Sequence, residues 1–390
     1  MLTLLTNARV HAPEPLGVRD LLIAADRIAW IGDAGAAPVL PDSEGVAVVD
    51  LEGRRVVPGF VDGHAHLTGG GGESGFRSRV PPVAVSRFTS AGVTAVVGVL
   101  GTDDITRSTR DLVAAAYGLR EEGIGAWCHC GGYHLPPVTV TGSVSDDIVF
   151  VDPVIGVGEV AISDHRSSQP TVDELLRLAS EAHVAGLVTG KAGILHLHLG
   201  DGERGLDLVR QALAVSELPA RVFNPTHVNR QPALFEEALE LAKAGAYVDV
   251  TAYPVADGDP SLSAADAIRR FLDSDAPADK LTVSSDGGGC LPEFDADGVL
   301  TRMDIGSPAA LSTTFRELAA DGVPLEQLAA VFSANPARLL RLHGRGAIAP
   351  GAVADLIVLD DAFHIRDVMA SGRWHVREAA LVKHGLFESP

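Results

Sequence analysis

The sequence predicts an α/β protein with a closed (β/α)8 barrel in the middle and a small β-domain built from both ends of the chain. Three observations support this prediction. Strand-like runs occur at both ends of the 390-residue chain. Eight apolar, strand-like runs alternate with helical segments between them. No glycine-rich dinucleotide fingerprint follows the first central strand, which disfavours the alternative, an open doubly wound sheet.

The small β-domain is expected to comprise residues 1–54 and 346–390. Its strand-like runs are bounded by turn-rich segments. They are Leu2–Val10, Asp20–Ile31, Val46–Leu51, Ala354–Leu359 and Gly372–Val376. Since both ends of the chain supply strands and the middle has a different pattern, one domain built from both ends is the most economical arrangement.

The barrel is expected over residues 55–345. Its strands are predicted at Arg55–Val61, Thr94–Leu100, Gly125–Cys130, Val154–Ile162, Ile194–Leu199, Val222–Val228, Ala246–Thr251 and Leu281–Ser285. Apolar residues at i, i+3 and i+4 spacing predict helices between them, the clearest being Val172–Val188, Leu206–Val215, Pro232–Ala244 and Ala264–Phe271. The first of these helices is preceded by Thr171 and contains Glu174, which is the pattern of a capping box.

Composition restricts the partners and the compartment. A formal net charge of −20 argues against binding to nucleic acid, which requires a basic surface, although a pocket can still be locally positive. No apolar run approaches the roughly eighteen residues of a membrane span, and the first residues lack a signal-peptide pattern. The chain has only three cysteines, an odd and small number that does not suit a disulfide framework. We therefore expect a cytoplasmic protein.

Polar residues at the ends of the predicted barrel strands indicate a metal site. Reactive side chains of parallel barrels gather where strands end and loops begin. The candidates are His64, His66, Glu159, Asp164, His165, His196, His198, His227 and Asp286. A single strand histidine is more often a core or surface residue, but the joint placement at five strand ends is not expected by chance. Imidazole and carboxylate ligands suit zinc or another divalent first-row metal.

Strand alternation helps to choose among these candidates. His64 and His66 are two residues apart and therefore point to the same face. His196 and His198 also share a face, and His198 is preferred because it is nearer the end of its strand. His196 is expected to be a neutral, hydrogen-bonded core residue. The run Cys128–Cys130 lacks a second cysteine pair, and we expect no metal there.

The segment Pro58–His66, with the later histidines and Asp286, resembles the signature of the amidohydrolase superfamily, and so do Asn335–Ala337 and Ala354–Leu359. Within that superfamily the chain is most similar to the isoaspartyl dipeptidases, over essentially its whole length. The runs that carry the closer resemblance lie outside the general signature. They are Gly69–Glu73, Gly101–Asp103, Gly132–His134, Ile162–Arg166, Pro225–Arg230 and Ser284–Gly287.

The resemblance implies hydrolysis of β-aspartyl dipeptides at a centre of two divalent metal ions, with zinc as the expected metal. One metal would be held by His64, His66 and Asp286, and the other by His198 and His227. Glu159 and a hydroxide would bridge them, and the hydroxide would attack the side-chain amide. Asp286 would move the proton to the leaving amine, and Tyr133 would stabilise the oxyanion.

The resemblance also implies the substrate contacts. Glu73, on the glycine loop with Gly71 and Gly72, would bind the free α-ammonium group of the substrate, and Thr102 the α-carboxylate. Arg166 and Arg230 would bind the carboxylate of the leaving amino acid, because planar guanidinium groups form paired hydrogen bonds with carboxylates. A homo-oligomer is expected as well.

Two residues depart from the family pattern. Family members typically bridge the metals with a carboxylated lysine on the fourth barrel strand, where this chain has Glu159. The four lysines, Lys191, Lys243, Lys280 and Lys383, lie elsewhere. Cys290 stands where the family usually has a serine that contacts substrate. A thiol is the weaker hydrogen-bonding group, so affinity or substrate preference is expected to differ.

Two other readings compete with this one. Another amidohydrolase, such as an N-acyl-amino-acid deacylase or a cyclic-amide hydrolase, would share the metal ligands and differ in the pocket. The charged set of Glu73, Arg166 and Arg230 argues against a neutral substrate. A non-catalytic barrel that serves as an interaction scaffold would be expected to lose ligands, whereas this sequence contains a complete set.

Overall fold

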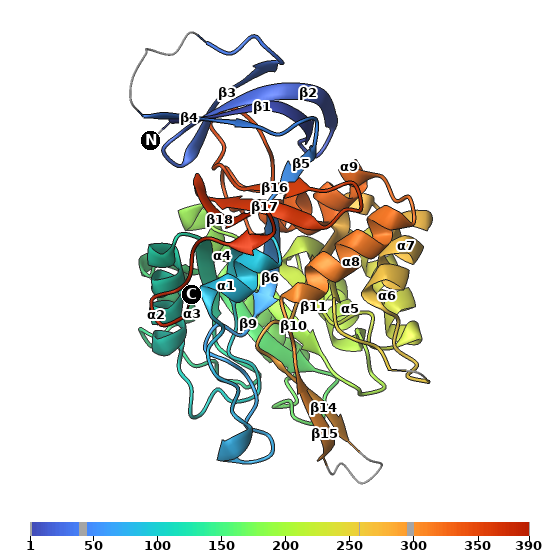
Figure 1. Ribbon diagram of the computed structural model, residues 1–390. Helices are drawn as coiled ribbons and strands as arrows, with labels where there is room; N and C mark the ends of the chain where they lie inside the picture. The colour runs from blue at the N-terminus through green and yellow to red at the C-terminus, as the bar shows by residue number, and fades with distance from the viewer. Residues whose placement is uncertain (1, 39–44, 257, 295–299, 390) are drawn as a thin grey trace.

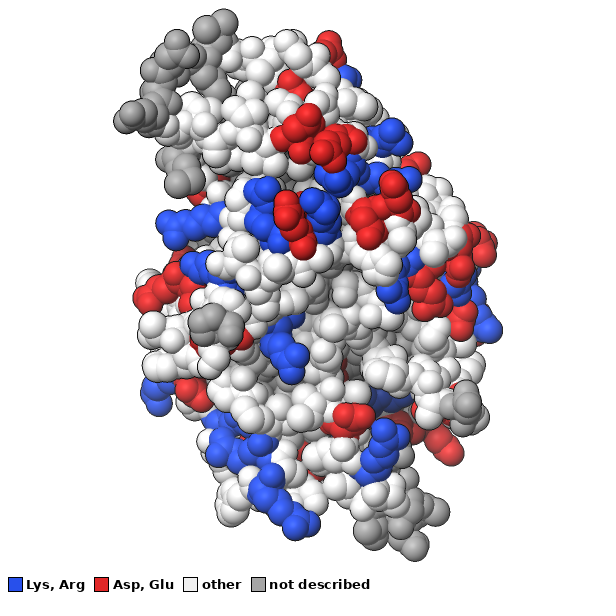
Figure 2. Space-filling model, in the orientation of Figure 1, with Lys and Arg blue, Asp and Glu red and all other residues white. Residues whose placement is uncertain are grey.

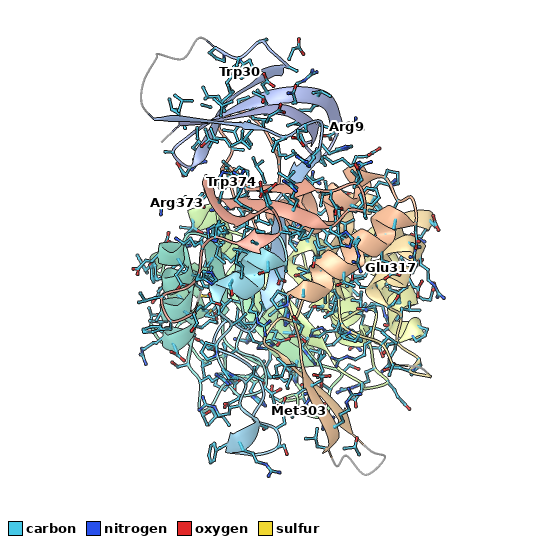
Figure 3. All side chains as sticks on the ribbon, in the orientation of Figure 1. Arg9, Trp30, Met303, Glu317, Arg373 and Trp374 are labelled. Atoms are coloured by element: carbon cyan, nitrogen blue, oxygen red, sulfur yellow. The ribbon has the colours of Figure 1, made fainter. Side chains whose placement is uncertain are left out.

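The computed structural model describes residues 2–38, 45–256, 258–294 and 300–389. A β-domain lies at one end of the molecule and a barrel of strands and helices forms the rest (Figure 1). Trp30 in the β-domain and Met303 near the opposite end of the barrel mark the two ends of the long axis (Figure 3). Acidic and basic side chains are interspersed over the face shown in Figure 2.

The β-domain is one sheet in which both ends of the chain pair with each other. Its strand order is β19-β18-β17-β16-β5-β1-β2-β3, with β4 beside β1. The strands are β1 Leu2–His11, β2 Pro15–Ala24, β3 Arg27–Asp33, β4 Val46–Asp50, β5 Arg55–Pro58, β16 Leu356–Leu359, β17 Ile365–Ala370, β18 Arg373–Arg377 and β19 Ala380–Leu381. The antiparallel pair β5–β16, with Ile357 opposite Val57, joins the two ends.

Two strand predictions in this region are wrong. The run Asp20–Ile31 is not one strand, because the chain turns at Ala25, which has a φ of 55°, and β2 and β3 form a hairpin. The run Arg55–Val61 is divided at Gly59, where an added Cβ would lie 2.2 Å from the side chain of Thr94. Since Arg55–Pro58 pairs within the terminal sheet, we propose that the β-domain extends to Pro58 and not only to residue 54.

The barrel consists of eight parallel strands, as the sequence predicts. They are β6 Phe60–Ala65, β7 Val93–Gly98, β8 Gly125–Cys130, β9 Val154–Ile162, β10 Leu195–Leu199, β11 Phe223–Thr226, β12 Val248–Thr251 and β13 Leu281–Ser284. Strands β6 to β11 pair in chain order, and β12 pairs with β13. The N–H of Val228 donates to the carbonyl of Asp249, and the N–H of Asp286 donates to the carbonyl of His64. These bonds connect the two sheets on both sides and close the barrel.

Helices surround the barrel (Figure 1). They are α1 Val85–Ser90, α2 Thr109–Glu122, α3 Val144–Phe150, α4 Val172–Thr189, α5 Asp207–Ala214, α6 Pro232–Lys243, α7 Ala264–Asp273, α8 Ala309–Ala320, α9 Leu325–Ala329 and α10 Asn335–Leu339. Short 3-10 helices occur at Phe76–Ser78, Ala220–Val222 and Ala278–Lys280, and a π-helical segment, Ala330–Ala334, joins α9 to α10. The four predicted helices are confirmed. The capping box of α4 is complete, since the Thr171 hydroxyl accepts from the N–H of Glu174 and the Glu174 carboxylate accepts from the N–H of Thr171. Among the described residues, no helix has the length and apolar character to cross a membrane.

A hairpin that the sequence did not predict follows the last barrel strand. It consists of β14 Cys290–Phe294 and β15 Leu300–Ile305 and projects from the barrel on the side away from the β-domain (Figure 1). The hairpin brings Leu291, Arg302 and Asp304 to the wall of the main pocket. It therefore contributes to the site although it is not part of the barrel.

Candidate metal centre and substrate pocket

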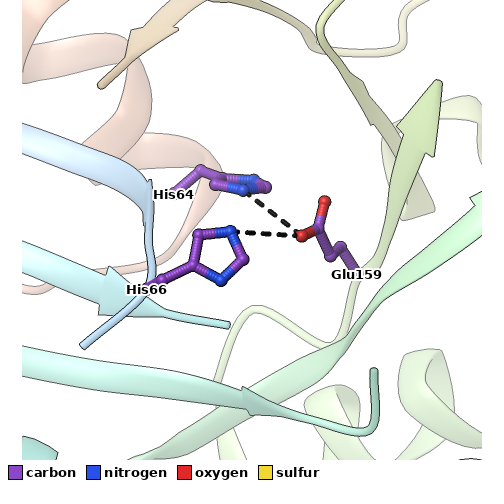
Figure 4. Close-up of side chains that lie close together, drawn as sticks. All are labelled: His64, His66 and Glu159. Carbon is purple, nitrogen blue, oxygen red and sulfur yellow. Dashed lines mark ion pairs between the residues drawn. The ribbon is translucent and has the colours of Figure 1, made fainter. Parts of the chain in front are cut away.

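Six predicted metal ligands meet at the C-terminal end of the barrel. Glu159 on β9 lies among the histidines. Its Oε1 atom is 3.6 Å from His64 Nε2 and 3.5 Å from His66 Nε2 (Figure 4). Its Oε2 atom is 3.0 Å from His198 Nδ1 and 3.6 Å from His227 Nε2. The two oxygens of one carboxylate therefore face two different pairs of histidines.

Asp286 completes this cluster from the end of β13. Its Oδ1 atom is 3.0 Å from His66 Nε2 and 3.5 Å from His64 Nε2. Asp286 and His227 both have a positive φ, 50° and 61°, which is uncommon for residues other than glycine. All six side chains are buried.

The donor atoms suit a divalent metal. Three overlapping groups of three side chains place their ligand atoms within 4.8 Å of one another: His64, His66 and Glu159; His64, His227 and Asp286; and Glu159, His198 and His227. Within the described part of the chain, the buried atoms His64 Nε2 and Asp286 Oδ1 have no hydrogen-bond partner. Buried polar atoms are normally satisfied, and imidazole and carboxylate groups without a partner fit metal coordination.

The electrostatics keep the carboxylates ionised. Burial would raise the pKa of Glu159, but the charges of His64 and His198 outweigh burial and hold this pKa well below its ordinary value. His64 and His66 similarly lower the pKa of Asp286 against the effect of burial. Burial lowers the pKa of His227 to about 3, so this imidazole is neutral at pH 7. Ionised carboxylates and neutral imidazoles are the forms that bind metals.

His64 shows that this part of the site attracts positive charge. Burial alone would lower its pKa, but the nearby carboxylates of Glu159 and Asp286 raise it to about 9. A proton and a metal ion compete for the same lone pair of an imidazole nitrogen. The corner between His64, Glu159 and Asp286 is therefore a place where a cation is favoured.

The second nitrogen of each histidine has a partner that orients the ring. His66 Nδ1 lies 3.3 Å from the carbonyl oxygen of Leu100, and His227 Nδ1 lies 2.7 Å from the hydroxyl of Thr251. His198 Nε2 lies 3.1 Å from Asp164 Oδ2. Such partners fix the tautomer of a metal ligand. The sequence analysis assigned no role to Thr251, and it named Asp164 among the candidate metal-site residues but not as the partner of His198.

A cavity of about 500 Å³ opens beside the metal ligands. Its wall is formed by Tyr133, His165, Arg166, Asp201, His227, Arg230, Tyr253, Pro254, Val255, Ala256, Asp259, Ser261, Asp286, Cys290, Leu291, Arg302 and Asp304. The Tyr133 hydroxyl is 2.8 Å from His198 Nδ1. Burial, followed by the charge of Glu159, raises the pKa of Tyr133 well above its ordinary value, so this group remains a hydrogen-bond donor.

Glu73 forms hydrogen bonds with three other residues that were predicted to contact the substrate. Its carboxylate accepts hydrogen bonds from the Thr102 hydroxyl at 3.0 Å, from Arg166 Nη1 at 3.3 Å and from the Cys290 thiol at 3.1 Å. Arg166 and Cys290 also line the main cavity, which places Glu73 directly behind its wall. Gly71 and Gly72 adjoin Glu73 but line a smaller cavity of about 200 Å³ together with it and Thr102.

The two arginines differ in their surroundings. Arg166 forms a paired contact with Asp164, through Nε to Oδ1 at 3.0 Å and Nη2 to Oδ2 at 2.7 Å. Arg230 also lines the cavity, and no carboxylate among the described residues lies within ion-pair distance of its guanidinium. Of the two arginines, Arg230 is therefore the one whose charge is not compensated by a carboxylate among the described residues. A surface groove of about 680 Å³ between α5 and α6 is larger than this cavity but contains none of the candidate ligands.

Comparison with known proteins agrees with this geometry. Residues 55–375 match the model of the amidohydrolase family. A beta-aspartyl dipeptidase from Fervidobacterium islandicum AW-1, solved in complex with beta-Asp-Leu dipeptide, is 40% identical, with 98% of this chain and 97% of that chain covered and a TM-score of 0.92. A second structure of beta-aspartyl dipeptidase from that organism is 38% identical, with 98% of each chain covered and a TM-score of 0.89.

A more distant relative has a different name. An imidazolonepropionase from Streptomyces coelicolor is 27% identical over 386 residues, covering 90% of this chain and 88% of the relative. The family match, the barrel fold and the clustered ligands all indicate a metal-dependent hydrolase. The chain belongs to the amidohydrolase family, a family of metal-dependent hydrolases, and its predicted similarity to isoaspartyl (beta-aspartyl) dipeptidases is confirmed.

Proposed function

We propose that this enzyme hydrolyses β-aspartyl dipeptides to aspartate and a free amino acid at a centre of two zinc ions. The observation that carries this proposal is the combination of charges in one pocket. The guanidinium of Arg230, which forms no ion pair with a carboxylate of the described residues, lines the same cavity as Asp286 and His227, and Glu73 contacts two further residues of its wall. A dipeptide with an ammonium group and two carboxylates suits this set of charges. The similar structure that holds beta-Asp-Leu supports the proposal.

His64, His66 and Asp286 would hold one metal ion, and His198 and His227 the other, with Glu159 between them. The separation of the Glu159 oxygens toward two pairs of histidines supports a bridging role. When bound, divalent metals polarise an amide carbonyl and lower the pKa of water toward about 7.

The residues of the chain would then act on the substrate and its protons. Asp286 is ionised and borders the cavity, so its carboxylate can accept a proton from water and later transfer it to the leaving amine. The Tyr133 hydroxyl would donate to the oxyanion, a contribution typically worth about 2.7–4 kcal/mol. Arg230 would hold the carboxylate of the leaving amino acid, and Glu73 the ammonium group of the aspartyl residue.

A panel of substrates tests this proposal. Zinc-loaded protein is expected to hydrolyse β-Asp-Leu much faster than α-Asp-Leu or N-acetyl-leucine, with Asp286→Asn protein as the background control. Equal rates on both aspartyl linkages, or no turnover of the β-linked series, would reject the substrate assignment and leave the amidohydrolase assignment intact.

The relative named imidazolonepropionase makes a cyclic-amide hydrolase the second candidate function. Imidazolonepropionate therefore belongs in the same panel. If it is the preferred substrate, the second candidate replaces the first. The number and identity of the metal ions, which we propose to be two zinc ions per chain, can be counted by elemental analysis of the purified protein.

We also propose a cytoplasmic location and a homo-oligomeric state. The three cysteines are free thiols in the structure, two of them buried, which suits a reducing compartment. For the oligomer, α4 presents Val184, Leu187 and Val188 on its exposed side, and an apolar stripe at this spacing is suited to a protein contact. Light scattering coupled to gel filtration measures the oligomeric state.

A further inference from the structure

A row of buried polar side chains begins at the metal ligand His64 and continues behind the metal centre with two residues that have no role in the proposed mechanism. It consists of His64 on β6, His196 on β10 and Asn224 on β11, all 3% exposed or less. His64 Nδ1 is 2.8 Å from His196 Nε2, and His196 Nδ1 is 2.8 Å from Asn224 Oδ1. These two contacts form a continuous chain of hydrogen bonds across three strands of the barrel.

The backbone determines the orientation of Asn224 at the far end. Asn224 Nδ2 lies 3.2 Å from the carbonyl oxygen of Tyr247. A carbonyl oxygen can only accept, so the amide nitrogen must face Tyr247 and the amide oxygen must face His196. Because that oxygen can also only accept, His196 Nδ1 must carry a hydrogen.

The same reasoning determines which nitrogen of His64 carries a hydrogen. No carboxylate in the described part of the chain lies within 4.0 Å of a His196 ring nitrogen, and a second proton on His196 would create a buried charge without a counterion. A neutral imidazole carries one hydrogen, so His196 Nε2 is an acceptor. His64 Nδ1 must therefore carry the hydrogen of that contact, so in the neutral form of His64 that binds a metal the lone pair is on Nε2.

That lone pair points to the place where the metal ligands meet. His64 Nε2 is 3.5 Å from Asp286 Oδ1 and 3.6 Å from Glu159 Oε1. We infer that His196 and Asn224 are positioning residues, which set the tautomer of His64 so that its Nε2 atom binds the metal. The inference rests on the metal role proposed above for His64. It gives a specific task to the buried histidine that the sequence suggested to be only a core residue.

His129 on β8 provides a matched control. Its ring is stacked on that of His196, with ring centroids 5.3 Å apart, and both rings are buried. No hydrogen bond joins His129 to His64, His196 or Asn224 in the described chain. A substitution at His129 therefore disturbs the packing of the same layer without interrupting the order of donors and acceptors.

The test compares metal retention in His196→Leu, His196→Gln and His129→Leu proteins. Zinc content is measured while a chelator is titrated, so that the readout does not depend on activity. Loss of an orienting partner typically costs about 10–100-fold in metal affinity, and His196→Leu is expected to release zinc at correspondingly lower chelator concentrations. His196→Gln should behave almost as the wild type, because its amide can accept from His64 and donate to Asn224. His129→Leu should also retain zinc.

A second pair of variants covers the case in which His196→Leu does not fold. Asn224→Leu removes the terminal acceptor and should weaken zinc retention, whereas His129→Leu, in the same buried layer, should preserve it. Equal retention in His196→Leu and His129→Leu, or equal losses in His196→Gln and His196→Leu, would overturn the inference. Wild-type protein without metal would overturn the proposed metal centre as well, so the two failures are distinguishable.

Discussion

Glu159 is the residue whose identity most affects the chemistry of the metal centre. A carboxylated lysine must first capture carbon dioxide, whereas the charge of a glutamate is intrinsic. The carboxylate of Glu159 is buried and faces four histidines. The sequence identified this departure, but only the structure shows that the shorter side chain still reaches both pairs of histidines.

The first prediction concerns assembly of the centre. Metal-free protein is expected to regain full activity with zinc alone, without bicarbonate. Glu159→Ala should lower both zinc content and turnover, because the two cations would no longer share an anionic ligand. Glu159→Lys should not restore the site when bicarbonate is added. Glu159→Ala protein that holds two zinc ions and turns over normally would contradict the bridging role.

The position of Arg230 on the cavity wall leads to a kinetic prediction. Arg230→Lys is expected to raise KM about tenfold or more with a smaller effect on kcat, because an ammonium group cannot reproduce two parallel hydrogen bonds to a carboxylate. Arg210→Lys, on the exposed side of α5, serves as the control. Steady-state kinetics with β-Asp-Leu measures both parameters. Unchanged kinetics for Arg230→Lys would reject the carboxylate contact.

Cys290 is expected to remain a thiol at neutral and mildly basic pH. Burial and then the negative charge of Glu73 raise the pKa of this thiol above its ordinary value, so the reactive thiolate appears only at higher pH than for a free cysteine. Alkylation by iodoacetamide at about pH 8 should be much slower than that of a free cysteine. Mass spectrometry follows the reaction, and labelling at the rate of free cysteine would contradict the assigned environment.

At the scale of elements, the sequence predicted best where hydrophobic pattern and capping agree. Seven of the eight barrel strands were found within a few residues, because buried parallel strands are short apolar runs, and so was the helix after Thr171, whereas the first barrel strand was placed too early in the chain. The hairpin of β2 and β3 was missed because its turn, at Ala25, contains neither glycine nor proline. The β14–β15 hairpin was missed because its charged residues do not resemble a buried strand.

The capping box of α4 allows a prediction about stability. Thr171→Ala removes the acceptor for the N–H of Glu174 and should lower the free energy of unfolding by about 1 kcal/mol. Ser180→Ala, at an exposed position within the same helix, should be neutral or slightly stabilising. Calorimetric Tm values of the two variants, compared with the wild type, measure the difference. A Thr171→Ala protein as stable as Ser180→Ala would show that the cap contributes nothing.

For the whole molecule, the candidate ligands could be predicted because barrel topology brings strand ends together whatever the loops do. The substrate contacts were less predictable. The pairing of Arg166 with Asp164 and Glu73, and the position of Arg230 on the cavity wall, depend on the conformations of loops that have no regular sequence pattern. The placement of Gly71 and Gly72 beside a separate cavity also depends on a loop conformation that the sequence pattern does not determine.

The last prediction concerns metal removal and the stability of the whole protein. A ligand that binds only the folded state stabilises it by RT ln(1 + [L]/Kd), which is about 4 kcal/mol at a thousandfold excess over Kd. The ligands come from β6, β9 and β10 and from the ends of β11 and β13, so a bound metal would connect strands around much of the barrel. Chelation is expected to lower Tm by several degrees, and added zinc to restore it. Glu159→Ala protein, which is expected to bind zinc weakly, should show a smaller change on chelation. Calorimetry with and without chelator measures these shifts, and an unchanged wild-type Tm after zinc is shown to be removed would mean that the metal does not stabilise the folded barrel.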